Sequence, residues 1–309
     1  MLGSHISRLT IFIGQNIIRR ILVRLDSRPM AILMIRGGLG NQLFQLSALT
    51  YYAKLFNFNS IICDHLLLTS PNTKRDGGIA QFRLLPVEVM VPSIVRVNIF
   101  QSFIVQRILY ILYRLSVKYD SQKILSEEHL QEAPSLPTFF FIQGSFQDKK
   151  YPLLLAPDEI APLIEYVRPV QPLSNCVNQC LIHIRLTDFI DATNSVPSEM
   201  EIFYTKLLDN LENIYSLAKL DAICFSDDLP WAKKIVESFN FRSVICPEQI
   251  HSFTPIELLK QMANYNLYVA SQSSLIWWAI FLTWKQDSNI QVIHDWSTNH
   301  NFLIPELDT

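Results

Sequence analysis

Short apolar runs alternate with longer segments of helical periodicity along much of the chain. Met30–Ile35 is an apolar run short enough for a buried strand, and the apolar residues from 42 to 56 recur at helical spacing. A second apolar run at 61–63 ends at Asp64, which indicates another strand. The first part of the chain is therefore predicted to place β and α units on a parallel sheet.

The same rhythm continues with a strand predicted at 139–142 and restarts after residues 151–172, where five prolines mark a domain crossover. Two Rossmann-like domains in tandem are the economical interpretation, with ligands at the carboxyl ends of their strands. We predict an N-terminal domain at 30–150 after a basic, apolar extension at 1–29, and a C-terminal domain at 173–309. Strands are predicted at 180–184, 221–225, 244–246, 267–270 and 291–293, and helices at 200–217, 231–239, 255–265 and 275–283.

Composition narrows the classes of partner. A net charge of -2 and a pI near 6.4 give no reason to expect nucleic acid, so phosphate recognition must be local. The five cysteines are an odd number at irregular spacing, typical of buried thiols in a reducing compartment. Cys176 and Cys180 resemble half of a metal site, but no second pair follows at ligand spacing, which favours a structural role.

Two basic, apolar stretches bear on membrane contact. Residues 1–35 contain no uninterrupted apolar run near the ~18–20 residues that span a bilayer, and no signal-peptide core. Residues 91–118 carry four basic residues and no acid among many aliphatics. Such a helix either lies on an anionic membrane surface or is half-buried with its arginines reaching solvent, and both interpretations stay open. We predict a cytoplasmic enzyme, with peripheral contact at the inner face of the membrane as the open alternative.

The predicted strand at 180–184 delivers His183 and Arg185 to the same side of its carboxyl end. Ligands bind at this end of an open α/β sheet, and arginine grips phosphate oxygens with a planar, permanently charged fork. Asp188 could orient that guanidinium, and Thr187 could donate a hydroxyl hydrogen bond. On this segment alone, an Arg–Asp salt bridge with a buried structural His183 is the favoured alternative, because short motifs match by chance.

Three of the chain's 8 glycines lie within four positions, between a predicted strand and a predicted helix. Gly38 and Gly40 let the backbone approach a ligand, and the helix N-terminus that follows favours anions. The loop lacks the features of a dinucleotide fingerprint and of a Walker loop. The alternative is a tight turn capped by Asn41, but the concentration of glycine favours a functional loop.

Two more polar clusters follow predicted strands. One of Ser226, Asp227 and Asp228 is expected to cap the next helix, and a carboxylate there could also accept hydrogen bonds from the edge of a guanine. The segment Ser271-Gln272-Ser273-Ser274 leads into a predicted helix, and its free amides and hydroxyls make a plausible pyrophosphate cradle to which Ser273 and Ser274 belong. The adjacent pair Trp277–Trp278 is assigned to the core.

Taken together, these segments resemble the α-1,2-fucosyltransferases of glycosyltransferase family 11. Gly-Gly-Leu-Gly-Asn-Gln-Leu-Phe-Gln at 37–45 is similar to the family's first motif. His183-Ile-Arg185-Leu-Thr-Asp188 resembles the H-x-R-R-x-D segment, which α-1,6- and protein O-fucosyltransferases share. The resemblance runs in the family's order through about residues 31–296 and includes three further motifs, at 143–151, 225–231 and 273–278.

The resemblance implies a GT-B fold, with two Rossmann-like domains facing a cleft. The C-terminal domain would hold GDP-β-L-fucose, with Arg185 on the donor's phosphates and His183 and Asp188 as its flanking catalytic partners. It implies inverting transfer to a galactose-terminated glycan in cell-surface polysaccharide or glycan synthesis, with no cofactor beyond the donor and no metal. Arg185 would then stabilise the charge of the leaving diphosphate. The other donor-binding candidates are Thr187, Asp227, Asp228, Ser273 and Ser274, with Gly38, Gly40, Asn41 and Gln42 facing the cleft from the N-terminal domain.

Leu186 and Ile276 depart from the family pattern. Leu186 replaces the second arginine, which puts the tightness of donor binding in question, and Ile276 replaces a serine at a position that affects packing. No residue is assigned as the base; the candidates by domain are Asp64, Asp76, Glu88 and Asp148. The alternatives are a GT-B transferase of different donor or linkage, a decayed GDP-sugar-binding protein, and a membrane-associated scaffold.

Overall fold

The computed structural model contains two compact units, Met1–Ile160 and Ala161–Thr309, called here the N-terminal and C-terminal units. The division falls inside helix α9 (Pro157–Val167), within the stretch predicted as the crossover. The predicted domain limits themselves stay a prediction. The structure describes residues 28–35, 37–64, 103–119, 121–132, 135–168, 178–186, 196–247 and 252–295.

The N-terminal unit is built on a parallel sheet of strand order β2-β1-β4-β3. Strand β1 is buried along its whole length, as its apolar run predicted. Strand β3 was not predicted, because two residues are too short to show any periodicity. The strands are β1 (Met30–Ile35), β2 (Asn59–Asp64), β3 (Ile124–Leu125) and β4 (Phe139–Ile142).

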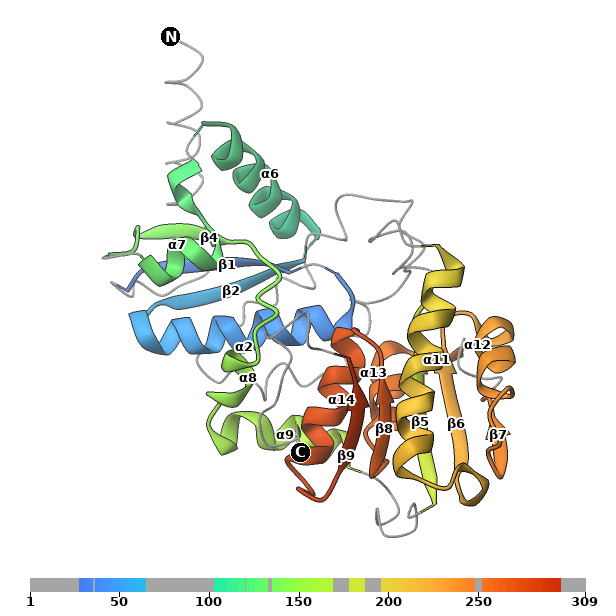
Figure 1. Cartoon of the computed structure of the whole chain (residues 1–309). Helices are drawn as coiled ribbons and strands as arrows, with labels where there is room; N and C mark the ends of the chain where they lie inside the picture. Colours follow the sequence, from blue (N-terminus) through green and yellow to red (C-terminus); the bar gives the residue numbers. More distant parts are fainter. Residues whose placement is uncertain are drawn as a thin grey trace. The chain divides into compact units, whose positions relative to one another are not determined.

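Helix α2 (Leu39–Phe56) begins earlier than the sequence pattern predicted. Its N-cap is Gly38, whose backbone is extended, so Gly40 and Asn41 lie inside the first turn. The alternative that Asn41 caps the turn is therefore wrong. Figure 1 shows α2 and α6 (Phe103–Tyr119) on opposite faces of the sheet. The unit also contains the short helices η2 (Ser121–Lys123), α7 (Glu127–Glu132) and α8 (Lys150–Leu153).

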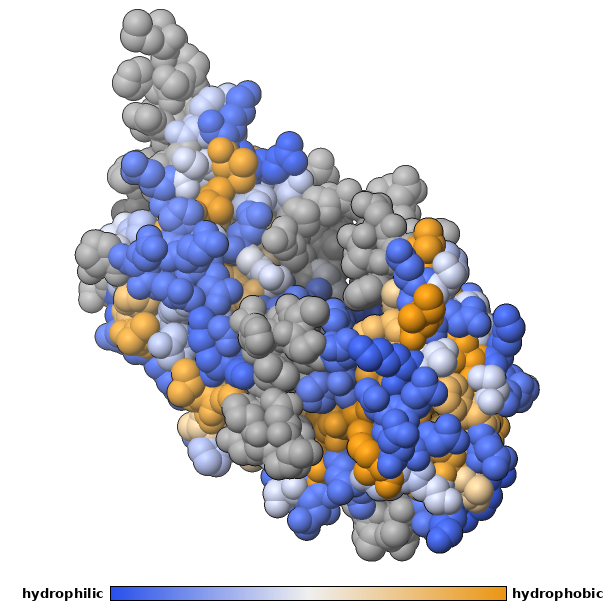
Figure 2. All heavy atoms as spheres, viewed as in Figure 1, coloured by the Kyte–Doolittle hydropathy of each residue, from blue (hydrophilic) through white to orange (hydrophobic). Residues whose placement is uncertain are grey.

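Helix α6 covers the described part of the basic stretch, since residues 91–102 lie outside the described ranges. Leu109 and Leu112 pack into a core cluster with β1 and β4, so one face is buried. The other face combines apolar with basic side chains, and Figure 2 shows orange among blue in this region. In the described ranges no helix has the length and apolarity to cross a membrane. The half-buried helix is confirmed, and surface contact with a membrane stays a prediction. The exposed side chains are Ile108, Ile111, Arg114, Val117 and Lys118.

The C-terminal unit is built on a parallel sheet of order β7-β6-β5-β8-β9. All elements predicted for this unit are present, with ends that differ by at most a few residues. The strands are β5 (Gln179–Ile184), β6 (Asp221–Ser226), β7 (Ser243–Ile245), β8 (Leu267–Ala270) and β9 (Gln291–His294). The helices are α11 (Pro197–Ile214), η4 (Leu217–Lys219), α12 (Leu229–Val236), α13 (Pro255–Met262) and α14 (Ser274–Trp284).

The order of this sheet reverses beside β5. The chain runs outward from β5 through β6 to β7, then returns to the other side of β5 for β8 and β9. His183, near the carboxyl end of β5, pairs in register with Phe225 on one side and Ala270 on the other. Ligands of open α/β sheets bind at such a switch point, so the topology itself selects this edge as the candidate site.

The core of the C-terminal unit confirms two assignments. Trp277 and Trp278 are fully buried, with ring centroids 5.5 Å apart in an edge-to-face arrangement. Cys180 and Cys224 are buried free thiols as predicted, whereas the free thiol of Cys246 is only partly buried. Cys176, the other half of the weak metal pair, lies outside the described residues, and the described part of the chain contains no cluster of three His, Cys, Asp or Glu side chains suited to a metal.

Candidate functional site

His183 is buried at the carboxyl end of β5, where its ring Nδ1 lies 2.7 Å from Ser271 Oγ. Burial and, to a smaller extent, the positive charge of Arg185 together lower the pKa of His183 to about 4. The imidazole is therefore neutral near pH 7 and offers hydrogen bonding instead of charge. Its position next to Arg185 leaves one positive charge at this strand end, not two.

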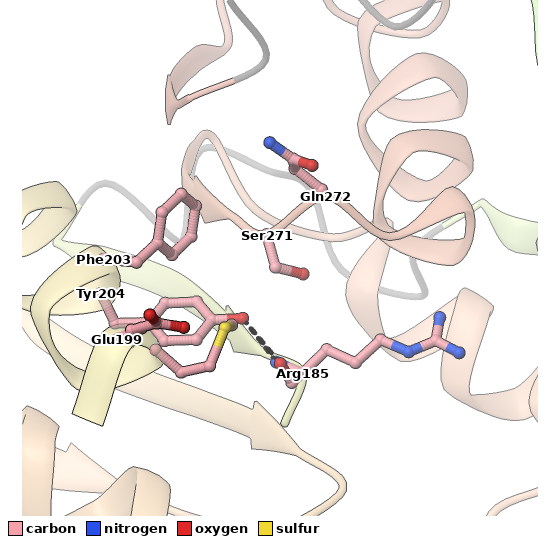
Figure 3. A pocket seen from close by; sticks show the side chains of 7 residues that line it. Arg185, Glu199, Phe203, Tyr204, Ser271 and Gln272 are labelled. Carbon is pink, nitrogen blue, oxygen red and sulfur yellow. Dashed lines mark hydrogen bonds between the residues drawn. The ribbon is translucent and has the colours of Figure 1, made fainter. Parts of the chain in front are cut away.

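Arg185 follows β5 directly, and two neighbouring elements hold it. Its backbone N–H donates to the Tyr204 hydroxyl at 2.9 Å, and that hydroxyl donates to the Arg185 carbonyl at 3.0 Å. At the other end of the side chain, Nη1 donates to Ser273 Oγ at 3.2 Å. Figure 3 shows the side chain extending away from the Tyr204 ring, so backbone and guanidinium are fixed separately.

A cavity of about 200 Å³ lies beside these residues. One wall comes from α11 and is mostly apolar, and the other comes from the loop after β8 (Figure 3). Apolar walls with a few polar groups are typical of small-molecule sites. The lining residues are Arg185, Glu199, Met200, Phe203, Tyr204, Ser271 and Gln272.

Ser273 is the N-cap of α14, and Ser274 begins the helix. The backbone of Ser273 is extended and its side chain accepts no capping hydrogen bond, so the hydroxyl faces Arg185 instead. The first amides of α14 therefore lie close to a guanidinium, an arrangement that favours a bound anion. Ile276, the departure from the family pattern in this helix, is fully buried and acts in packing.

Asp227 and Asp228 have different tasks. Asp227 is exposed, and its Oδ1 accepts a hydrogen bond from the Leu186 backbone N–H at 2.8 Å, which ties the end of β6 to the end of β5. Asp228 caps α12 by accepting from the Trp231 N–H at 3.1 Å. The expectation that one residue of Ser226-Asp227-Asp228 caps the helix is confirmed. Contact of either with a nucleotide stays a prediction.

Leu186 occupies the place of the family's second arginine. Its side chain is 5% exposed and belongs to the main core cluster of the C-terminal unit. The chain therefore uses this position for packing, and Arg185 is its single arginine in the motif. Thr187 and Asp188 lie outside the described residues, so neither their predicted roles nor the alternative Arg185–Asp188 salt bridge is tested.

The glycine loop of the N-terminal unit is held by its own polar side chains. Gly37 has φ +82°, and a Cβ there would lie 2.8 Å from Asn41 Nδ2, so any other residue would be strained and would displace the Asn41 side chain. Gln42 is fully buried, and its Nε2 donates to the Gly37 carbonyl at 2.6 Å. Its Oε1 has no hydrogen-bond partner among the described residues. Donor contact by Gly38, Gly40, Asn41 and Gln42 stays a prediction.

The glycine loop also contacts the motif at 143–151. Gln147 Nε2 donates to Asn41 Oδ1 at 2.5 Å, and Gln45 Nε2 donates to the Gly144 carbonyl at 3.0 Å. Two segments that the sequence presented separately thus form one structure. No spacing rule could have paired them, because about a hundred residues lie between the partners.

Of the base candidates, only Asp148 has a described side-chain environment. Its Oδ1 accepts from the Lys150 N–H at 2.8 Å, and its Oδ2 pairs with Lys150 Nζ at 3.0 Å. The carboxylate is therefore already engaged, which argues against Asp148 as the base. The Asp64 side chain, Asp76 and Glu88 lie outside the described part.

Tyr204 is the main site residue that sequence reasoning missed. It falls on the apolar stripe of a predicted helix, where its spacing indicates only a core position. Glu199 and Phe203 of the same helix were missed too, since no motif contains them. Only the packing of α11 against β5 reveals them.

Two units with helix-covered parallel sheets, one with an arginine and a helix N-terminus at its switch point, define an α/β fold of the GT-B glycosyltransferase type. The chain belongs to glycosyl transferase family 11, whose profile, "Glycosyl transferase family 11", matches residues 88–306. The glycine motif at 37–45 precedes the matched residues. No curated protein matches the chain.

Solved structures share the fold. The fucosyltransferase NodZ from Bradyrhizobium is similar with a TM-score of 0.51 at 12% identity, covering 84% of this chain and 94% of that one. Its selenomethionine form gives a TM-score of 0.50 at 13% identity, covering 84% and 93%. The expected fold class is thereby confirmed.

Proposed function

We propose that the protein is an inverting fucosyltransferase that moves L-fucose from GDP-β-L-fucose to the 2-hydroxyl of a galactose-terminated glycan, without a metal. Membership of glycosyl transferase family 11 supports glycosyl transfer, and the motif resemblance supports fucose as the sugar and the α-1,2 linkage. The observation that carries the site assignment is Arg185, joined to Ser273 at the N-terminus of α14.

This arrangement suits the departure of a nucleoside diphosphate. In the transition state the sugar gains oxocarbenium character, and negative charge develops on the β-phosphate. A fixed guanidinium and the free amides of a helix N-terminus stabilise that charge without reorganising. Neutral His183 can add a hydrogen bond without competing for the anion. Loss of one such group costs about 3 kcal/mol of barrier, or roughly a hundredfold in rate.

The direct test incubates purified protein with GDP-fucose and a panel of galactose-terminated acceptors, with EDTA present. We expect mass increases of one deoxyhexose and 2-linked galactose on methylation analysis. A product linked through another hydroxyl would assign a different linkage, and transfer only from another sugar nucleotide would overturn the donor. Tight GDP binding without turnover on any acceptor would favour the decayed binding protein.

Arg185→Ala tests the site. We expect at least a hundredfold loss of kcat/KM with little change in Tm. Arg242→Ala is the matched control, because Arg242 is an exposed arginine of the same unit that pairs with Asp221 on the surface. Full activity in Arg185→Ala, or an equal loss in both variants, would remove Arg185 from the site.

A further inference from the structure

A single buried hydroxyl binds both backbone groups of Arg185. Tyr204 Oη accepts from the Arg185 N–H at 2.9 Å and donates to the Arg185 carbonyl at 3.0 Å. Tyr204 is 1% exposed, so water does not compete for either bond. The Tyr204 side chain, which comes from helix α11, thus fixes both the N–H and the carbonyl of Arg185.

The contact lies where the strand ladder ends. The pairing of β5 with β6 ends at Ile184 and Ser226, and its pairing with β8 ends at His183 and Ala270. Arg185 is the first residue beyond both ladders, so strand pairing no longer dictates its φ and ψ. The Tyr204 hydroxyl supplies the donor and the acceptor that a neighbouring strand would otherwise offer.

The hydroxyl is itself held rigidly. The Tyr204 ring lies edge-on to Phe203, with centroids 5.1 Å apart, and to Trp231 at 6.1 Å. Trp231 belongs to α12, whose N-cap is Asp228, so two helices fix this ring. Burial raises the pKa of Tyr204, and the group therefore stays a hydrogen-bond donor throughout the physiological range.

We infer that Tyr204 is a positioning residue for the transfer reaction: it fixes the Arg185 backbone so that the guanidinium, anchored on Ser273, meets the donor's diphosphate. This inference rests on the proposed function, which places Arg185 on that diphosphate. The burial of Leu186 in the core increases the demand on Tyr204, because the motif offers the phosphates no second arginine. A misplaced Arg185 would have no substitute within the segment.

Tyr204→Phe removes the hydroxyl and keeps the ring. Tyr268→Phe is the matched control: Tyr268 is fully buried in the same unit, and its hydroxyl bonds to the Met262 carbonyl at 3.1 Å and Thr283 Oγ1 at 2.9 Å. Both variants lose a buried hydroxyl that bonds to a backbone N–H and to a backbone carbonyl, so both should lower Tm. A structural role alone predicts no further difference between them.

The readout is the affinity for GDP compared with that for guanosine, measured as inhibition constants. We expect Tyr204→Phe to weaken GDP binding by roughly tenfold and to change the affinity for guanosine by no more than about twofold. Only GDP carries the phosphates that Arg185 contacts. Tyr268→Phe should change neither. Should Tyr204→Phe not fold, Tyr204→Gln tests the same contact and should also weaken GDP more than guanosine.

Arg185→Ala distinguishes a failure of the proposed donor site from a failure of the positioning role of Tyr204. If it leaves GDP affinity unchanged, the proposed site fails whatever Tyr204 does. If Arg185→Ala weakens GDP while Tyr204→Phe behaves like Tyr268→Phe, the site stands and the positioning role is refuted. Equal weakening of GDP and guanosine in Tyr204→Phe would also refute it.

Discussion

The carboxyl end of the C-terminal sheet and the glycine loop of the N-terminal unit use polar side chains in opposite ways. At the sheet end, Arg185, His183 and Ser273 lie beside a cavity. The Arg185 guanidinium bonds to Ser273, the N-cap of α14. Next to the glycine loop, Gln42 and Gln45 of α2 are buried amides that donate to backbone carbonyls. The sheet end offers a charged group to a ligand, whereas the polar side chains at the glycine loop stabilise the local backbone conformation.

The difference matters because both regions carry family motifs of similar length. Neutral amides can satisfy carbonyls in a dry interior at little cost, whereas a guanidinium is stable only near solvent or an anion. Substitutions in the glycine loop should therefore act first on stability, and those at the sheet end first on phosphate binding and pH response. Three measurements separate the two regions, and a fourth, with the smallest expected effect, tests helix α6.

The largest effect is expected in the pH dependence of stability. The pKa of His183 falls from 6.5 to about 4 on folding, so between these values the unfolded chain binds a proton that the folded chain does not. Stability is then fully present above pH 6.5 and falls by about 1.4 kcal/mol per unit, about 3 kcal/mol in all, as the pH drops toward 4.

His183→Gln should flatten this acid branch in urea unfolding at pH 7, 6, 5 and 4. His129→Gln, which alters an exposed histidine of the N-terminal unit that bonds to Ser126, should leave it unchanged. Parallel curves for all three proteins would show that His183 is not buried as a neutral ring.

Gly37→Ala should lower the free energy of unfolding by about 2 kcal/mol, from left-handed backbone strain and displacement of Asn41. Asn57→Ala is the control, since Asn57 is an exposed left-handed residue at the other end of α2. The Asn57→Ala substitution should lower the free energy of unfolding by about half as much as Gly37→Ala. Thermal unfolding checks both, and a Gly37→Ala protein of native stability would contradict the structural role of the loop.

Ser273→Ala should weaken GDP binding by roughly tenfold, the value of one hydrogen bond to a charged group, with little change in stability. Titration calorimetry provides the measurement. Ser238→Ala removes a hydroxyl that bonds to the Ile235 carbonyl in the same unit and should bind GDP normally. Identical affinities in the two variants would show that Ser273 does not support Arg185 in binding.

The smallest effect concerns the outer face of α6. Vesicles containing about a third phosphatidylglycerol should bind the protein more than neutral vesicles do, and Arg114→Gln should reduce binding about fivefold, since each cation near such a surface contributes about 1 kcal/mol. Flotation of the protein with each vesicle type measures this. Equal flotation of wild type and Arg114→Gln would leave α6 as a half-buried helix only.

Sequence periodicity located the C-terminal elements well, because strands such as β8 are short apolar runs bounded by turn signals. It missed β3 and placed the start of α2 too late, since neither a two-residue strand nor a glycine N-cap shows apolar spacing. The motif around Arg185 was readable as chemistry for a similar local reason, because the sequence places an arginine directly after a predicted buried strand.

The sequence by itself determined the order of elements, the arginine at a strand end and the likeness to a family of transferases, because these depend on neighbours within a few residues. The tertiary structure alone decided which distant groups meet. Tyr204 reaches Arg185 from another helix, Asp227 joins β6 to β5, and Gln147 joins Asn41. Such contacts follow from strand order and helix packing, which bring together atoms whose separation along the chain carries no signal.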